Sequence, residues 1–258
     1  MGTMATLLLA LSCCALLIYP VVQRMRRNGF FVAAVPLAAS FAVLLPLGIS
    51  GSTVTEEMSW LPQLGLNLTF RMDQLSWLFA LLVTGAGALV LLYCRNYFDN
   101  DEEGLARFAA VFLGFGASML GLVLADNVYL LFIFWEATSV FSFLLIAHAH
   151  KRRTSRSSAL QALMVTTAGG LVMLVGLVIL ATQSGTPNLS EIIARPPTGL
   201  LATISVYLVL VGALSKSAIF PFHFWLPGAM AAPTPVSAYL HAATMVKAGV
   251  YLVAALSP

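Results

Sequence analysis

Five ionisable residues lie within the most apolar stretches of this sequence, where a charge is costly to bury. They are Glu136, Lys216, His223, His241 and Lys247. Ionisable side chains inside apolar spans are rare and mostly belong to ion or proton pathways. Carboxylate, ammonium and imidazole groups can each bind and release a proton. We therefore interpret these five residues as candidate proton carriers.

Glu136 is the only carboxylate in the interior of a predicted span, and Lys216 lies in another span. A lone ammonium in a low-dielectric region tends to lose its proton, whereas a nearby carboxylate favours the charged form. A Glu136–Lys216 pair is thus the simplest way to keep both charges at depth, and separating the partners would release the lysine proton more readily. The alternative is a static ion pair that only orients helices, because buried pairs are weak evidence for stability.

The histidines differ in how well they suit a relay. His223 and His241 could pass protons between fixed lysines, because imidazole titrates near neutral pH. His223 lies near one end of its segment and could instead only cap backbone groups. His148 and His150 lie beside a basic loop, and we expect both to be solvated.

The elements that must position these residues follow from composition. Hydrophobic residues make up 60% of the 258 residues and charged residues only 9%, whereas soluble domains carry about 25% charged residues. A chain with so few charged residues would expose a largely apolar surface, which suits the hydrocarbon core of a membrane. A helix that crosses this core needs roughly 20 apolar residues. We predict an all-α polytopic membrane protein with a single membrane domain over 1–258. Its eight predicted spans are 4–22, 29–49, 74–94, 106–125, 127–147, 157–182, 200–226 and 235–256.

The seventh predicted span carries a helix breaker next to its lysine. Pro221 follows Lys216 by five residues. Proline removes one backbone hydrogen bond and kinks a helix, and transporters place broken helices at ion sites near the membrane midplane. We therefore expect a kinked helix over 200–226, with Lys216 near its middle.

The loop between the second and third spans has a strand pattern. Leu64, Leu66, Leu68 and Phe70 alternate with other residues, and this period of two is typical of a strand. We predict a small extracytoplasmic hairpin here; an irregular loop is the alternative.

Basic residues set the predicted orientation. Nine of the thirteen Lys and Arg residues fall in the loops after spans one, three and five, whereas only Arg71 and Arg195 fall on the opposite side. Because basic residues concentrate in cytoplasmic loops, the amino terminus is expected outside. The first apolar run precedes its arginines, unlike a signal peptide, so it is expected to remain as a helix.

Other kinds of chemistry find no support in the sequence. Cys13, Cys14 and Cys94 have neither disulfide nor metal-site spacing, and no glycine-rich nucleotide loop is present. We expect no bound cofactor, no metal and no nucleic-acid partner.

Three stretches resemble a known family. They are Phe134-Trp135-Glu136, the run Lys216-Ser-Ala-Ile-Phe-Pro-Phe-His-Phe-Trp-Leu-Pro227, and the run from Ala232 to Gly249 that includes His241 and Lys247. These stretches resemble the antiporter-like subunits of respiratory complex I and, more closely, the A component of Mrp-type multisubunit sodium/proton antiporters. The resemblance covers most of 60–258 and is most specific over 212–251.

The resemblance implies roles and partners. Glu136 would pair with Lys216, His223 and His241 would relay protons, and Lys247 would match a lysine of the Mrp component. Complex I subunits often have a small polar residue there, which favours the Mrp reading. The chain would be a transporter subunit, not an enzyme. It would exchange Na⁺ and H⁺ with other membrane subunits in a prokaryotic cell membrane. The alternative is a proton-pumping subunit of a complex I-type quinone oxidoreductase or membrane-bound hydrogenase.

The chain departs from this family in one respect. Members carry a second, inverted repeat after the eighth helix. The sequence accounts for three leading helices over 1–105 and a first repeat over 106–258. We expect either a truncated sequence or a second half on a separate polypeptide. An inert helical scaffold is a third reading, but charged residues at several mid-span positions argue against it.

Overall fold

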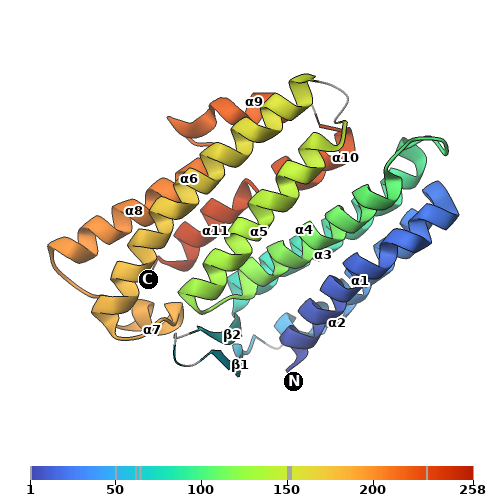
Figure 1. The fold of residues 1–258 in the computed structure, drawn as a ribbon. Coiled ribbons are helices and arrows are strands. Elements are labelled where there is room, and N and C mark those ends of the chain that lie inside the picture. The colour runs from blue at the N-terminus through green and yellow to red at the C-terminus, as the bar shows by residue number, and fades with distance from the viewer. Residues whose placement is uncertain are drawn as a thin grey trace.

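Long helices laid side by side form most of the computed structural model (Figure 1), which describes residues 2–49, 51–61, 63, 66–149, 153–230 and 232–257. The helices of more than eight residues are α1 (Thr3–Met25), α2 (Gly29–Ile49), α3 (Gln74–Tyr97), α4 (Leu105–Leu124), α5 (Val128–Ile146), α6 (Arg153–Ser184), α8 (Leu200–Lys216) and α11 (Lys247–Ala255). The shorter α-helices are α7 (Leu189–Ala194), α9 (Trp225–Ala229) and α10 (Thr234–Val236). Leu64, His150, Lys151 and Arg152, which entered the sequence-based predictions, lie outside the described residues.

The described helices bear out a multi-pass membrane protein. Six stretches are long and apolar enough to cross a membrane by length and composition. The first, Thr3–Ile49, comprises α1 and α2, which pack against each other, and Leu200–Lys216 is a shorter apolar helix. Many large apolar side chains on the outer faces are exposed, as expected where hydrocarbon is the solvent.

Helix α4 lies at the centre of the bundle. It packs against α1, α3 and α5, and nearly all of its residues are buried. Glycines allow this close packing: a Cβ at Gly121 would overlap the ring of Phe134, and one at Gly114 would crowd the ring of Phe141. The glycines of α4 therefore fix how closely α5, which carries Glu136, approaches the core.

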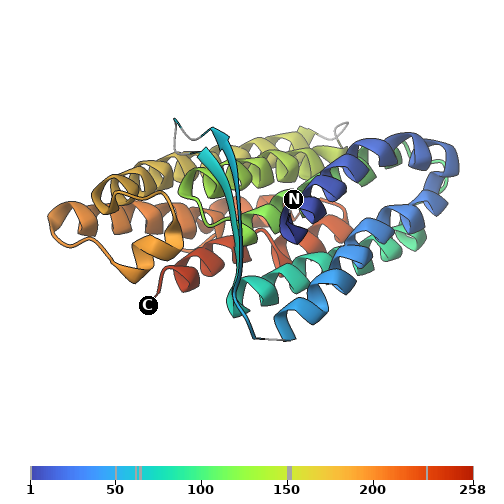
Figure 2. The ribbon, with the colours of Figure 1, turned by 90° about the horizontal axis from the view of Figure 1, so that it is seen from below.

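Two antiparallel strands, β1 (Val54–Leu61) and β2 (Leu66–Met72), cross one end of the bundle near the amino terminus (Figure 2). Val54 pairs with Met72 and Glu57 with Thr69, and the register is irregular between Met58 and Leu61. The strands occupy the segment whose alternation predicted a hairpin.

The turn between α4 and α5 ties several elements together at the same end. The backbone N–H of Asp126 donates to Thr69 O of β2 at 2.9 Å. Its carboxylate accepts from the N–H of Ser190 at 2.9 Å and from the hydroxyl of Ser190 at 2.6 Å. The N–H of Leu189 donates to Asp126 O at 2.6 Å. One buried aspartate thus joins β2, α7 and the α4–α5 turn.

The prediction of one kinked helix over 200–226 is wrong. Helix α8 ends at Lys216 itself, and a separate helix, α9, starts at Trp225. Ala218 has a φ of +51°, and the N–H groups of Ala218 and Ile219 bond back to Ser215 O and Leu214 O at 3.4 and 3.0 Å. This is the Schellman arrangement that satisfies the last carbonyls of a helix, so the chain turns before Pro221 is reached.

The predicted helix over 235–256 is also interrupted. After α10, residues Ser237–Ala243 form a π-helix, labelled η5, and α11 begins at Lys247. The hydroxyl of Thr244 donates to Tyr239 O at 2.7 Å, and the N–H of Lys247 bonds to Thr244 O at 2.9 Å. Thr244 therefore takes over a carbonyl that a regular helix would satisfy with a backbone N–H.

Glu56 of β1 caps the first helix. Its carboxylate accepts from the N–H groups of Met4 and Ala5 at 3.0–3.2 Å. The first N–H groups of a helix have no partner inside the helix, and a carboxylate also favours the positive end of the helix dipole.

We predict that Glu56→Ala destabilises the protein, because the α1 terminus loses its acceptor. A lost cap costs about 1 kcal/mol, or a fall in Tm of about 2–4 °C, measured by thermal unfolding in detergent. Glu57→Ala is the matched control, because the carboxylate of exposed Glu57 accepts from Asn67 of β2. Equal losses for the two variants would refute the capping role.

Candidate functional site

Lys216 lies at the carboxyl end of α8 with a fully buried side chain. Its Nζ donates to Trp135 O at 2.6 Å, to Thr138 Oγ1 at 2.6 Å and to Ser139 Oγ at 3.0 Å. Its Nζ also lies 4.7 Å from the centroid of the Trp135 ring, a cation–π geometry. All of these groups come from α5, on one face of the helix, because residues three and four apart are neighbours.

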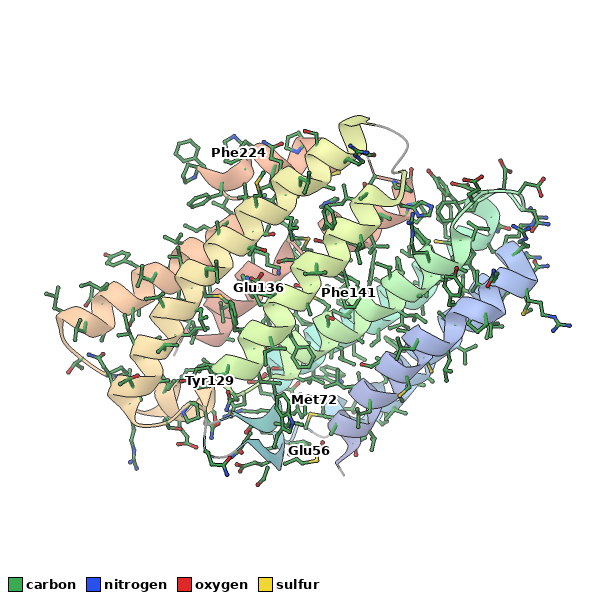
Figure 3. All side chains as sticks on the ribbon, viewed as in Figure 1. Glu56, Met72, Tyr129, Glu136, Phe141 and Phe224 are labelled. Atoms are coloured by element: carbon green, nitrogen blue, oxygen red, sulfur yellow. The ribbon has the colours of Figure 1, made fainter. Side chains whose placement is uncertain are left out.

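Glu136 follows Trp135 in α5 and faces α6, halfway along the helix (Figure 3). Its Oε2 accepts from the hydroxyl of Thr167 at 3.0 Å. Its Oε1 is buried, with no hydrogen-bond partner among the described residues. The carboxylate is thus held by one neutral donor and has a free acceptor.

The direct Glu136–Lys216 ion pair that the sequence suggested is not formed in the described part of the chain. Each partner is held by neutral groups instead: Lys216 by α5 and Glu136 by Thr167 of α6. The two residues still lie near each other, because Lys216 Nζ bonds to the carbonyl of Trp135, the residue that precedes Glu136. The structure therefore shows the two residues near one another but separated.

Glycines bring α6 close to both charged residues. A Cβ at Gly169 would overlap Ser215 Oγ, and one at Gly170 would overlap the Glu136 carboxylate. Helix α6 packs against both α5 and α8 (Figure 1). The small residues of α6 thus also make room for the half-buried side chain of Glu136.

His241 lies next to the Lys216 region. Trp225 donates its Nε1 hydrogen to Ser215 O at 3.0 Å, and its ring centroid is 6.1 Å from that of His241. His241 is 7% exposed, and neither ring nitrogen has a partner among the described residues. It sits in the π-helix η5, a geometry that often marks functional sites.

The other two candidates lie outside this cluster. His223 is exposed, and its ring stacks on Phe220 with centroids 5.8 Å apart. Lys247 is exposed at the start of α11. The described structure thus brings Glu136, Lys216 and His241 into one region and leaves His223 and Lys247 on the surface of this chain.

Sequence reasoning missed the hydroxyl groups that hold the charges. Thr138 and Ser139 lie two and three residues after Glu136, and Thr167 lies in α6. Small polar residues are common in membrane helices, where they usually bond to their own backbone. The available signal was spacing: 135, 138 and 139 follow the i, i+3, i+4 pattern of one helix face.

Comparison with known proteins places the chain in a family. Residues 125–258 match the family model described as "NADH:quinone oxidoreductase/Mrp antiporter, TM", and residues 60–109 match "NADH-Ubiquinone oxidoreductase (complex I), chain 5 N-terminus". The chain belongs to the NADH:quinone oxidoreductase/Mrp antiporter family. The resemblance to this family that the motifs indicated is confirmed.

Curated relatives include components of cation/proton antiporters. The chain is 49% identical over 236 residues to the A/B component of a probable K⁺/H⁺ antiporter of Rhizobium meliloti, covering 89% of this chain and 23% of the relative. It is 46% identical over 236 residues to the A component of an Na⁺/H⁺ antiporter of Alkalihalophilus pseudofirmus, covering 90% of this chain and 29% of the relative. The chain thus spans less than a third of the length of these relatives.

Solved structures agree on the fold. A chain of the Mrp complex from Dietzia sp. superposes with a TM-score of 0.90 at 37% identity, over 98% of this chain and 28% of that chain. A chain of the membrane-bound sulfane sulfur reductase, an archaeal respiratory membrane complex, superposes with a TM-score of 0.80 at 22% identity, over 98% of this chain and 53% of that chain. The second likeness shows the shared fold alone.

We predict that Gly170→Ala destabilises the protein, because the added methyl group overlaps the Glu136 carboxylate. Overpacking typically costs about 1–3 kcal/mol, measured as a fall in Tm in detergent. Ala168→Val, which adds volume on the exposed face of α6, is the control.

Gly170→Ala made in a Glu136→Ala background should lower the Tm much less, because the carboxylate that the new methyl group would overlap is gone. An equal loss in both backgrounds would mean that the carboxylate does not occupy the space beside Gly170.

Proposed function

We propose that this chain is the proton-translocating amino-terminal part of the A component in an Mrp-type multisubunit cation/proton antiporter that exchanges Na⁺ for H⁺. The observation that carries the proposal is the fully buried Lys216, held by neutral oxygens beside the separated carboxylate of Glu136. A charge at such depth is costly and is retained mainly where it moves an ion or proton. The names of the curated relatives support the transport class.

The proposed topology has eight membrane spans with the amino terminus outside. Helices α1 to α6, α8 and the interrupted segment α10–η5–α11 provide them. The leading helices lie within 1–105 and the first repeat within 106–258. The sheet of β1 and β2 lies at the outer end, because basic residues such as Arg24 and Arg107 lie at the opposite ends of their helices.

The proposed mechanism alternates the partners of Lys216. With Glu136 beside it, the ammonium is stabilised by an opposite charge. When Glu136 bonds to Thr167, Lys216 keeps only neutral acceptors and gives its proton to the next carrier more readily. His241 is the proposed acceptor, because both of its ring nitrogens are buried without partners among the described residues and its ring lies 6.1 Å from that of Trp225, which bonds to Ser215 O. The resulting amine is then protonated again from the opposite side.

Lys247 and His223 complete the proposed relay at its ends. Both are exposed on this chain, so their proton exchange would be with water or with a neighbouring polypeptide. Proline breaks and short helices near His223 resemble the broken helices that transporters place at ion sites.

The proposed partners are the other membrane subunits of the antiporter, in the bilayer of a prokaryotic cell. The proposed exchange activity belongs to this larger assembly, because a chain of a solved Mrp complex is similar to this one over 98% of its length. The chain would act as a transporter subunit without a resident cofactor.

The alternative is a proton-pumping subunit of a complex I-type oxidoreductase, which the match of residues 60–109 favours. The two functions differ in their partners. Co-purification with quinone-reducing or soluble dehydrogenase subunits would support the oxidoreductase, and co-purification with small membrane subunits alone would support the antiporter.

We predict that Lys216→Ala and Glu136→Gln each abolish sodium-dependent proton movement, because each removes one partner of the pair. The measurement is antiport in everted vesicles from an antiporter-deficient host that expresses the complete partner set. Arg195→Gln is the control, since exposed Arg195 lies in the loop between α7 and α8. Unchanged exchange in assembled Lys216→Ala complexes would show that the lysine is only structural.

A further inference from the structure

The ammonium group of Lys216 has as many hydrogen-bond acceptors around it as it has N–H donors. A charged lysine has three N–H donors and no acceptor, and Lys216 Nζ donates to three oxygens at 2.6, 2.6 and 3.0 Å. We infer that Trp135 O, Thr138 Oγ1 and Ser139 Oγ, here called the α5 cradle, form a second docking site for the charged lysine, distinct from its site beside Glu136. Thr138 and Ser139 are then positioning residues for the proposed transport.

The hydroxyl hydrogens of the α5 cradle are already engaged. Thr138 donates to Trp135 O at 2.7 Å and Ser139 donates to the same carbonyl at 3.3 Å. With their hydrogens directed there, both hydroxyl oxygens offer lone pairs to Lys216. A neutral amine has only two N–H donors and carries a lone pair that needs a donor. The cradle offers it none, so it fits the ammonium better than the amine.

The α5 cradle carries no formal charge. Its oxygens are dipoles, and the Trp135 ring adds its face at 4.7 Å. The two docking sites therefore differ in kind: one places a carboxylate beside the lysine and the other surrounds it with neutral acceptors. Glu136 has a matching neutral site, because Thr167 donates to its Oε2.

Such a site has a definite task in the proposed exchange. When Glu136 withdraws, a bare ammonium in the bundle would lose its proton at once to any acceptor. The α5 cradle holds the proton on Lys216 less firmly than a neighbouring Glu136 carboxylate would, but more firmly than a site without acceptors. The proton then leaves only when its acceptor is in place, which prevents proton movement that is not coupled to the cation. This inference rests on the proposed function.

The test uses antiport in everted vesicles with the complete partner set. Thr138→Val keeps the side-chain shape and removes one acceptor, so we expect a fall in the exchange rate of about tenfold, equivalent to about 1.4 kcal/mol. Thr138→Ser keeps the hydroxyl and should retain the rate within about twofold. Ser142→Ala is the matched control, because Ser142 is also buried one turn along α5 and its hydroxyl donates to Ser139 O.

Restoration by serine separates a hydroxyl role from a packing role. If assembled Thr138→Val complexes exchange as fast as the Ser142→Ala control, or if Thr138→Ser is as slow as Thr138→Val, the α5 cradle has no positioning role. If Thr138→Val does not assemble, Ser139→Ala replaces it in the test and Ser139→Thr is the variant that restores the hydroxyl. Exchange in Ser139→Ala as fast as in the Ser142→Ala control, or exchange in Ser139→Thr as slow as in Ser139→Ala, would then rule out the positioning role.

Lys216→Ala in the same assay separates this inference from the proposed function. Loss of exchange in Lys216→Ala together with normal exchange in Thr138→Val and Ser139→Ala would overturn the cradle alone. Normal exchange in Lys216→Ala would overturn the proposed function and the cradle with it.

Discussion

The arrangement of the core depends on the burial of one ammonium group without a carboxylate in direct contact. Removing a charge from water is expensive, and a low-dielectric region returns that energy only where hydrogen bonds are well placed. Lys216 obtains them from one face of α5. That requirement fixes the rotation of α5, and hence directs Glu136, the next residue after Trp135, toward α6. The position of the carboxylate is thus a consequence of how the lysine is satisfied.

Close approach of helices is the second condition for this arrangement. Gly169 and Gly170 let α6 lie against Ser215 and Glu136, and Gly249 similarly brings α11 against Ala213 O. Where apolar surface gains nothing by leaving lipid, van der Waals contact and interhelical hydrogen bonds must supply the association. The same glycines that tighten the bundle therefore determine which polar groups can meet inside it.

The sequence was sufficient for the membrane class, the positions of α1 to α6 and the choice of Lys216 and His241 as buried ionisable residues, because long apolar runs and isolated ionisable residues are strong signals. It was wrong for His223 and Lys247, which are exposed on this chain. It did not predict the end of α8 at Lys216 or the interruption before α11. Glycine is the usual sign of a Schellman helix end, and here Ala218 takes the positive φ. A π-helix has no composition of its own, so η5 could not be read from residues 237–243. The hydroxyl contacts of Lys216 depend on helix rotation, which no periodicity within α5 specifies.

The joint at Asp126 connects separate elements at one end of the bundle. Three elements are pinned there by one aspartate and its neighbours, and Glu56 anchors α1 at the same end. The interruptions after Lys216 and at Thr244 lie farther along the bundle, beyond this joint. A rotation of the segments that follow these interruptions would therefore change the surroundings of Lys216 and His241 without breaking the hydrogen bonds at the strand-bearing end.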